Sequence, residues 1–310
     1  MRFQERDGAI LWAIYVYGGL LARRHLQEMF FPGTTLRALQ KRLAKLVDNG
    51  YLARPTTHQR RTQPIPEPQI YWLGWKGMLW IAAQMGVEVE PPANLGENHI
   101  RKMEKQLRDQ GIRWLREPRW TQIAHDLAVV DFRLAVERAV AEVPSFSLEE
   151  WIFESEFRSE GDTISYQVPG ADGKVRQAKK RVYPDGYFVV VDEGRLAQGL
   201  LARARFLLEL DNATHANERF GREKVAPGVA YIKSKEYRVR FGVNSGRWLV
   251  VTTGERRMRN LMRQTQQVAG AEAGVFLFTT FDRLGTGNVL TDPVWWQIGR
   301  EEPIPLLSTG

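Results

Sequence analysis

The chain has 310 residues, which is long enough for two domains with a hydrophobic core each. It carries 44 Lys and Arg against 36 Asp and Glu, so the formal net charge is +8 and the sequence pI is about 9.7. This balance favours a polyanionic partner, nucleic acid before membrane. The absence of cysteine excludes disulfides and thiolate metal sites and fits a cytoplasmic setting. No apolar run approaches the roughly 18 residues of a membrane span, so we expect no membrane partner.

The first third of the chain predicts helices followed by a two-stranded hairpin. Apolar residues at helical spacing predict helices over 4–17, 21–29 and, after the break F-F-P-G, 34–49. Two short strands, Y-L-A-R-P and Q-I-Y-W-L, enclose the polar stretch H-Q-R-R-T-Q, which we interpret as a basic hairpin tip. A further helix over 76–85 closes the domain. This order is typical of a winged helix-turn-helix, in which the third helix enters the major groove and the wing crosses the backbone.

The third helix and the hairpin tip supply the candidate DNA contacts. An apolar stripe along the helix leaves a polar, basic face, from which we expect groove contacts, and the hairpin tip would contact phosphates. A solvated helix face, or a winged helix that binds another protein, is the alternative. The candidates are Arg37, Gln40, Lys41 and Lys45 on the helix and Arg60 and Arg61 on the hairpin.

The rest of the chain predicts a mixed sheet with helices on its faces, and therefore an α/β (α+β) fold. A long helix over 121–142 precedes four strand-like runs, and helices and strands then alternate. The lysine-rich stretch over 170–181 is interpreted as an exposed hairpin loop, and Thr214 as a helix cap. We place a winged-helix domain at 1–92, a linker and brace helix at 93–118 and the mixed-sheet domain at 119–310.

The stretch R-F-L-L-E-L-D places two carboxylates, Glu209 and Asp211, on one face of an apolar strand. Upstream, Asp185 begins a second strand in V-Y-P-D-G-Y-F-V-V-V, and Lys224 follows one element later. Three carboxylates at neighbouring strand ends predict a Mg²⁺ or Mn²⁺ site for phosphodiester cleavage, in which the ammonium neutralises charge on the phosphate. The alternative is a set of solvated strand ends.

Three accessory residues accompany this cluster. The expected strand L-E-E-W-I-F-E-S-E-F-R puts Glu154 and Glu156 on one face, so one of them could join the site. His125 lies near the start of a helix, as a structural group or as a catalyst. A His-hydrophobe-His metal site with a nucleophilic tyrosine finds no support, because the histidines are scattered, at positions His25, His58, His99, His125 and His215.

Several motifs give the chain a family resemblance: L-V-D-N-G-Y-L with Y-W-L-G-W-K-G, H-D-L-A-V-V-D, P-D-G-Y-F, and L-L-E-L-D-N-A-T followed by R-F-G-R-E-K. Through them the chain resembles the replication-relaxation family of plasmid and mobile-element proteins. Its acidic core also resembles the restriction-endonuclease-like, or PD-(D/E)XK, fold, which includes C-class mobilisation relaxases that nick plasmid DNA at a transfer origin. The resemblance implies a DNA reader fused to a nuclease-like domain.

The resemblance also assigns residues. It matches Asp185 to the first acid of the nuclease motif and Glu209 to the second. Asp211 stands where the common motif has lysine, and Lys224 on the following helix is the candidate replacement.

We therefore expect a metal-dependent endonuclease that nicks double-stranded DNA at a plasmid or mobile-element origin, with other replication or transfer proteins as further partners. Two alternatives remain open. One is a catalytically inactive DNA-binding replication initiator or transcriptional regulator, and the other is an interaction platform whose basic charge serves solubility.

Overall fold

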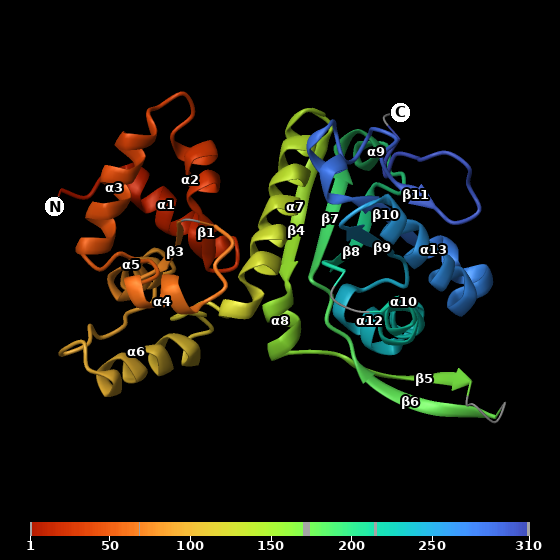
Figure 1. Ribbon diagram of the computed structural model, residues 1–310, viewed down its shortest axis with the longest axis horizontal. Helices are drawn as coiled ribbons and strands as arrows, with labels where there is room; N and C mark the ends of the chain where they lie inside the picture. The colour runs from red at the N-terminus through yellow and green to blue at the C-terminus, as the bar shows by residue number, and fades with distance from the viewer. Residues whose placement is uncertain (1, 68, 170–173, 214–215, 309–310) are drawn as a thin grey trace. The chain divides into compact units, whose positions relative to one another are not determined.

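The chain forms two compact units, Met1–Val130 and Asp131–Gly310. The structure is a computed structural model that describes residues 2–67, 69–169, 174–213 and 216–308 (Figure 1). The division falls within a single helix, and the domain limits expected near residues 92 and 118 stay a prediction. Within the described ranges, no helix has both the length and the apolar character needed to cross a bilayer.

The first unit combines helices with a three-stranded antiparallel sheet in which β3 lies between β1 and β2. Its α3 turns Leu39, Leu43 and Leu46 into the core, where all three are fully buried. The helical spacing of these leucines therefore dictates which face of α3 meets solvent. The elements are α1 Glu5–Val16, β1 Leu20–Ala22, α2 Arg23–Phe30, α3 Leu36–Asp48, β2 Leu52–Ala53, α4 Thr57–Thr62, β3 Ile70–Leu73, α5 Trp75–Gln84 and α6 Glu97–Asp109.

The polar stretch expected as a hairpin tip is a short helix, α4. Thr56 caps it, because the Thr56 hydroxyl accepts a hydrogen bond from the backbone N–H of Gln59 at 3.2 Å. The Gln59 side chain in turn accepts one from the Thr56 backbone N–H at 2.9 Å. This reciprocal pair is a capping box, which stabilises the first turn of a helix. Arg60 and Arg61 consequently lie on the exposed surface of a helix.

The second unit is built on a six-stranded sheet of order β11-β10-β9-β8-β7-β4, which confirms the expected mixed α/β fold. Strands β8, β9 and β10 run parallel, β7 is antiparallel to β8, and β4 is antiparallel to β7. Before this sheet, η1 Trp120–Gln122 belongs to the first unit, and the division between the units falls within α7 Ile123–Ala141. The elements that follow are β4 Phe146–Phe153, α8 Glu154–Ser159, β5 Thr163–Pro169, β6 Val175–Arg181, β7 Gly186–Asp192, α9 Glu193–Ala197, β8 Arg203–Asp211, α10 Asn217–Phe220, a π-helical turn Gly221–Val225, α11 Ala226–Lys233, α12 Lys235–Phe241, β9 Arg247–Thr252, α13 Glu255–Ala269, η3 Gly270–Val275, β10 Phe276–Thr280, η4 Phe281–Gly285 and β11 Trp296–Gln297.

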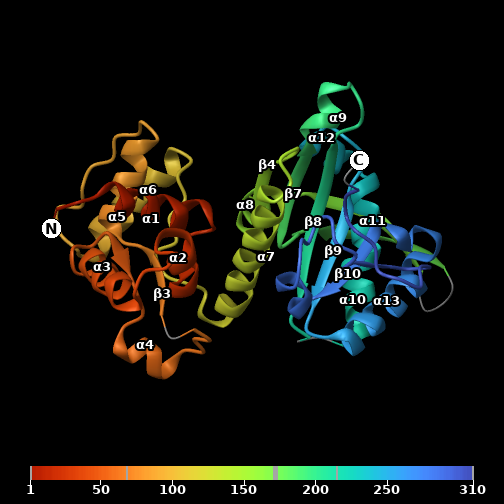
Figure 2. The same cartoon turned by 90° about the horizontal axis from the view of Figure 1, so that it is seen from above.

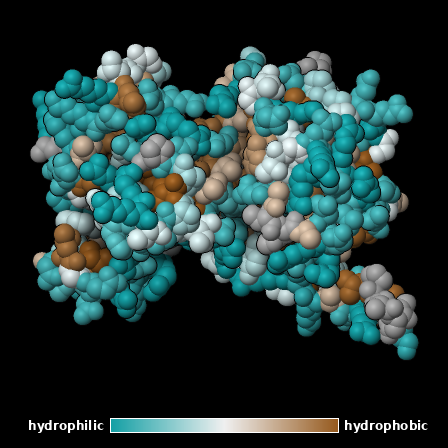
Figure 3. All heavy atoms as spheres, in the orientation of Figure 1, coloured by the Kyte–Doolittle hydropathy of each residue, from teal (hydrophilic) through white to brown (hydrophobic). Residues whose placement is uncertain are grey.

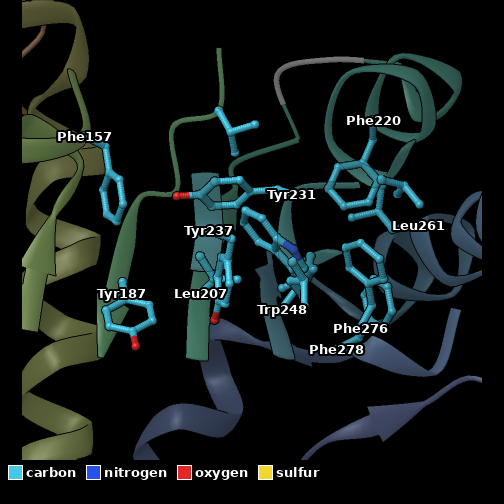
Figure 4. Close-up of a cluster of buried hydrophobic side chains, with 14 of the residues drawn as sticks. Phe157, Tyr187, Leu207, Phe220, Tyr231, Tyr237, Trp248, Leu261, Phe276 and Phe278 are labelled. Atoms are coloured by element: carbon cyan, nitrogen blue, oxygen red, sulfur yellow. The ribbon is translucent and has the colours of Figure 1, made fainter. Parts of the chain in front are cut away.

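Helices cover both faces of this sheet (Figure 2). On one face, Phe132 of α7 packs edge-on against Phe188 of β7, with 5.9 Å between ring centroids. On the other face, side chains of β7 to β10 and of α8 and α10 to α13 point toward one another and form the larger core (Figure 4). Burial of two faces explains why the strand β7 reads as a nearly continuous apolar run.

Two expectations in this unit are wrong. Glu154 and Glu156 lie on helix α8 rather than on a strand, because β4 ends at Phe153 and the Glu156 side chain accepts a hydrogen bond from the Phe153 backbone N–H at 3.2 Å. The lysine-rich stretch contributes β6, which pairs with β5 over seven residues in a separate two-stranded sheet. The proposed cap at Thr214 lies outside the described residues.

Two glycines of Y-W-L-G-W-K-G allow a close backbone approach in the first unit. A Cβ atom at Gly74 would lie 2.4 Å from the carbonyl oxygen of Gly50, and one at Gly77 would lie 2.3 Å from that of Tyr51. Backbone atoms cannot retreat as a flexible side chain can, so these glycines set the distance between α5 and the turn before β2.

We expect Gly77→Ala to lower the free energy of unfolding by about 1–3 kcal/mol, the usual cost of overpacking. Chemical denaturation of the purified chain measures this. Gly285→Ala is the matched control, because a Cβ there would meet no atom within 4 Å. Equal stability of the two variants would contradict the close approach.

Candidate functional site

One edge of the six-stranded sheet collects the acidic residues of the second unit. Strands β4 and β8 end at this edge and β7 begins there, because β7 runs antiparallel to both neighbours. Gly186 pairs with Leu208, and the Asp185 backbone N–H donates to the Leu208 carbonyl at 2.9 Å, so Asp185 lies across from Glu209. The Asp185 carboxylate also accepts a hydrogen bond from the Leu210 backbone N–H at 2.7 Å. Backbone pairing thus fixes the position of the first carboxylate.

Glu209 is buried, with 7% of its surface exposed, on the face of β8 that also carries Leu207. Its carboxylate lies 2.7 Å from the ammonium nitrogen of Lys224. Lys224 belongs to the π-helical turn Gly221–Val225, and the buried neighbours Phe220 and Val225 anchor that turn in the core. Turns of π-helix are frequent at functional sites, where they redirect a side chain.

Two opposing effects, burial and nearby carboxylates, determine the pKa of Lys224. Burial acts to lower its pKa, but the carboxylates of Glu209, Asp185 and Glu154 outweigh it and hold the pKa above its usual value. The side chain therefore stays a protonated ammonium at neutral pH. The effect of Glu154 on this pKa indicates that Glu154 lies close to the pair of Lys224 and Glu209. The Glu154 backbone N–H donates to the Asp185 carbonyl at 3.3 Å.

Asp211 has a different environment, although it shares a face of β8 with Glu209. Arg257 of α13 donates to both of its carboxylate oxygens, with both distances at 2.8 Å. The Thr252 hydroxyl donates to it as well, at 2.7 Å. The hydrogen bond that Arg257 donates to Asp211 is the main cause that raises the pKa of Arg257. Asp211 therefore ties the ends of β8 and β9 to α13.

The other expected site residues lie on other elements of the chain. Glu156 is exposed and forms part of the α8 cap. His125 is half-buried near the start of α7 and belongs to the first unit. In the first unit, Arg37, Lys41 and Lys45 are exposed along α3, and Gln40 beside them is half-buried.

Whether this cluster can bind a divalent cation depends on the oxygen ligands that it offers. Among the described residues, no group of three or more His, Asp or Glu side chains is arranged to hold a metal ion. Asp185 and Glu209 offer two carboxylates at one edge. That set fits Mg²⁺, which usually binds one or two protein carboxylates and completes its shell with water and substrate phosphate oxygens.

The sequence analysis did not identify two residues that interact with these acidic side chains. Arg257 is one of several arginines in E-R-R-M-R, and only the helical spacing of the buried Met258 and Leu261 could have placed it. Lys180 was assigned to a loop, yet burial lowers its pKa, and the charges of Glu223, Lys224 and Glu209 act on it.

Comparison with known proteins gives one family. The family model described as replication-relaxation matches residues 17–243, which is more than half of the chain. No curated protein and no solved structure matches the sequence.

Arg257 and Asp211 form a pair that is nearly buried, with side chains 15% and 10% exposed. We expect Arg257→Ala to lower the free energy of unfolding by about 3–5 kcal/mol, because it leaves the Asp211 carboxylate without its charge partner. Thermal and chemical denaturation measure the loss. The control is Arg259→Ala on the same helix, whose pair with Glu255 is exposed and should contribute about 1 kcal/mol or less. A loss below that of the control would contradict the assigned role of Asp211.

Proposed function

Because the chain belongs to the replication-relaxation family, which suggests a role in the replication or mobilisation of a plasmid or mobile element, we propose that it is a metal-dependent endonuclease that nicks duplex DNA. The observation that carries the proposal is the cluster at the sheet edge. Asp185 directly precedes β7, Glu209 lies on the adjacent strand β8, and the ammonium of Lys224 is 2.7 Å from the Glu209 carboxylate. Two acids and a lysine are the groups of a PD-(D/E)XK site, with the lysine supplied from a helix rather than from the strand.

The two acids supply the oxygen ligands that Mg²⁺ and Mn²⁺ prefer. When bound, such a cation supplies Lewis-acid stabilisation of a phosphoryl group and lowers the pKa of a water molecule. Asp185 and Glu209 would hold it. We leave Asp211 out of the ligand set, because Arg257 and Thr252 already donate to its carboxylate.

Lys224 would act on the phosphate. Its ammonium has three N–H donors, so it can engage a phosphate oxygen while it stays paired with Glu209. A fixed ammonium beside the attacked phosphate stabilises the charge that develops in the transition state. Glu209 thus has two tasks, to hold the cation and to orient the lysine.

We further propose that the first unit is a winged helix that reads DNA with α3. The order α1, β1, α2, α3, β2, α4, β3, with β3 paired to both other strands, supports this. Arg37, Lys41 and Lys45 follow one another at intervals of four residues, so they form one exposed row opposite the buried leucines. Arg60 and Arg61 on α4 would contact phosphates.

A second candidate function is a DNA-binding replication initiator or regulator without nuclease activity. The ion pair between Lys224 and Glu209 supports it, since such a pair also satisfies a buried carboxylate in a purely structural role. Cleavage assays separate the two functions.

We expect the protein to convert supercoiled plasmid that carries the origin of its own element to the nicked form in the presence of Mn²⁺. Asp185→Asn and Lys224→Met should each lower the nicking rate at least about 100-fold, the order of magnitude for loss of one electrostatic catalytic group. Gel electrophoresis of time courses measures the rate. Both variants should bind the same plasmid with unchanged affinity in a chelating buffer.

Asp282→Asn is the matched control, because it makes the same chemical change at an exposed residue of the same unit. Nicking by Asp185→Asn at the rate of this control would overturn the enzyme proposal. Persistent supercoiled DNA under conditions of proven binding would favour the initiator or regulator.

For the first unit, we expect Lys41→Ala and Arg60→Ala to weaken DNA binding and to reduce the slope of log K against log salt by about 0.9 each, because each lost cation leaves one phosphate unneutralised. Fluorescence anisotropy at several salt concentrations measures the slope. Lys105→Ala, at an exposed position on α6, provides the control. Slopes that match the control for both variants would count against DNA contact by α3 and α4.

A further inference from the structure

The two strands β5 and β6 form an antiparallel ribbon that extends away from the six-stranded sheet (Figure 1). We call this pair of strands, Thr163–Pro169 and Val175–Arg181, the basic ribbon. Its register runs without a bulge from Thr163 opposite Arg181 to Pro169 opposite Val175. Side chains therefore alternate strictly between two faces along its whole length.

One face of the basic ribbon is apolar at its base and packs against the protein. Ile164 is fully buried in the large core, Tyr166 packs against that core, and β5 contacts α11. Lys180, opposite Ile164, is half-buried on this face, and Ile164 shares its core with Leu207, which lies on the same face of β8 as Glu209. The base of the ribbon thus adjoins the acidic edge of the sheet.

The base is also held by a polar cluster around Asp162, the residue before β5. The Arg240 guanidinium donates to the Asp162 carboxylate at 2.7 Å, and the Tyr231 hydroxyl donates to it at 2.5 Å. The Arg240 and Asp162 side chains are 19% and 15% exposed. This cluster fixes the direction in which the ribbon leaves the sheet.

The opposite face is polar and exposed. It contains hydroxyl, amide and cationic side chains, and the apolar Val175 lies near the tip. The described strands carry no Asp or Glu on either face, whereas Arg176 and Lys180 add positive charge to the first face. The polar members of the outward face are Thr163, Ser165, Gln167, Gln177, Lys179 and Arg181, all of them exposed.

These side chains are the ones that recognise nucleic acid. Glutamine pairs with adenine through two hydrogen bonds, lysine and arginine pair with guanine, and serine and threonine serve either base or phosphate. A major groove admits a two-stranded β-ribbon. Seven paired residues span roughly 20 Å, which corresponds to about six base pairs. The face of this unit that Figure 3 shows is mainly hydrophilic.

We propose that the basic ribbon lies in the major groove of duplex DNA beside the phosphate to be cleaved and reads base edges with its outward face. The inference rests on the proposal that DNA is the substrate, and it adds a second sequence reader to the one proposed for α3. Gln167 and Gln177, which are directly paired across the ribbon, are its specificity-determining residues. Lys179 supplies charge next to them.

The test uses the full-length protein and a pool of DNA duplexes with a randomised central segment, in a chelating buffer so that no cleavage occurs. Bound duplexes are selected and sequenced. We expect the double variant Gln167→Ala, Gln177→Ala to lose about tenfold discrimination or more at neighbouring base pairs, with an unchanged salt slope. Lys179→Ala should keep the base preference and reduce the slope by about 0.9.

The controls match each change within the same unit. Gln266→Ala, Gln267→Ala removes two amides from α13, and Lys233→Ala removes one exposed cation from α11. Circular dichroism and the thermal midpoint establish that each variant is folded. Base preferences and salt slopes equal to those of the controls would overturn the proposal, as would tighter binding of single strands than of the selected duplexes.

The outcome is separable from that of the nuclease proposal. Loss of discrimination in the glutamine variant, together with a wild-type protein that fails to nick, supports the ribbon and overturns only the enzyme. Normal nicking with unaltered base preference overturns only the ribbon.

Discussion

The pairing of buried charge at the sheet edge is the constraint on which the second unit depends. Asp185 and Glu209 are 5% and 7% exposed, and a carboxylate at that depth is costly unless it is hydrogen-bonded and paired. Asp185 receives a backbone N–H, and Glu209 receives the ammonium of Lys224. The cation reaches this position because a π-helical turn, anchored by Phe220 and Val225, presents it over the end of β8. The packing of the core therefore also determines the electrostatics of the site, and a shift of α10 would alter both.

The two carboxylates on β8, Glu209 and Asp211, differ in the cation with which each one pairs. Arg257 engages both oxygens of Asp211 in a fixed fork, which suits a structural tie. Lys224 gives Glu209 a single compact charge on a flexible stem, and it remains partly exposed. An ammonium has three N–H donors and can engage a substrate oxygen beside Glu209, whereas the bidentate guanidinium is already committed. Two carboxylates on one strand thus form two kinds of pair. Asp211 with Arg257 is the structural pair, and Glu209 with Lys224 is the candidate catalytic pair.

Period-two and helical patterns predicted the mixed sheet and most of its elements, because strands β7 to β10 are apolar and their pattern is local. The acid positions also followed from pattern, since Glu209 and Asp211 interrupt an apolar strand. Three segments, α4, α8 and β6, were misread, because the contacts that decide their structure are not visible in composition. Helix α4 depends on the capping pair of Thr56 and Gln59, and β6 pairs with β5 although its charges resemble those of a loop. The pairing of Asp211 with Arg257 joins residues 46 positions apart, and no periodicity reports such a contact.

The two proposed recognition surfaces, the basic ribbon and α3, lie in different units of one chain. This arrangement affects the affinity for DNA. Two weak readers joined in a chain bind with an effective concentration set by their connection, so their combined affinity can exceed that of either alone by orders of magnitude. Each reader then needs few base contacts, which agrees with the small outward face of the basic ribbon and the single basic row on α3. Salt would weaken both readers together, because both carry lysine and arginine for phosphate contact. A site of two acids and a lysine that acts on any phosphodiester would take its selectivity from these surfaces rather than from its own chemistry.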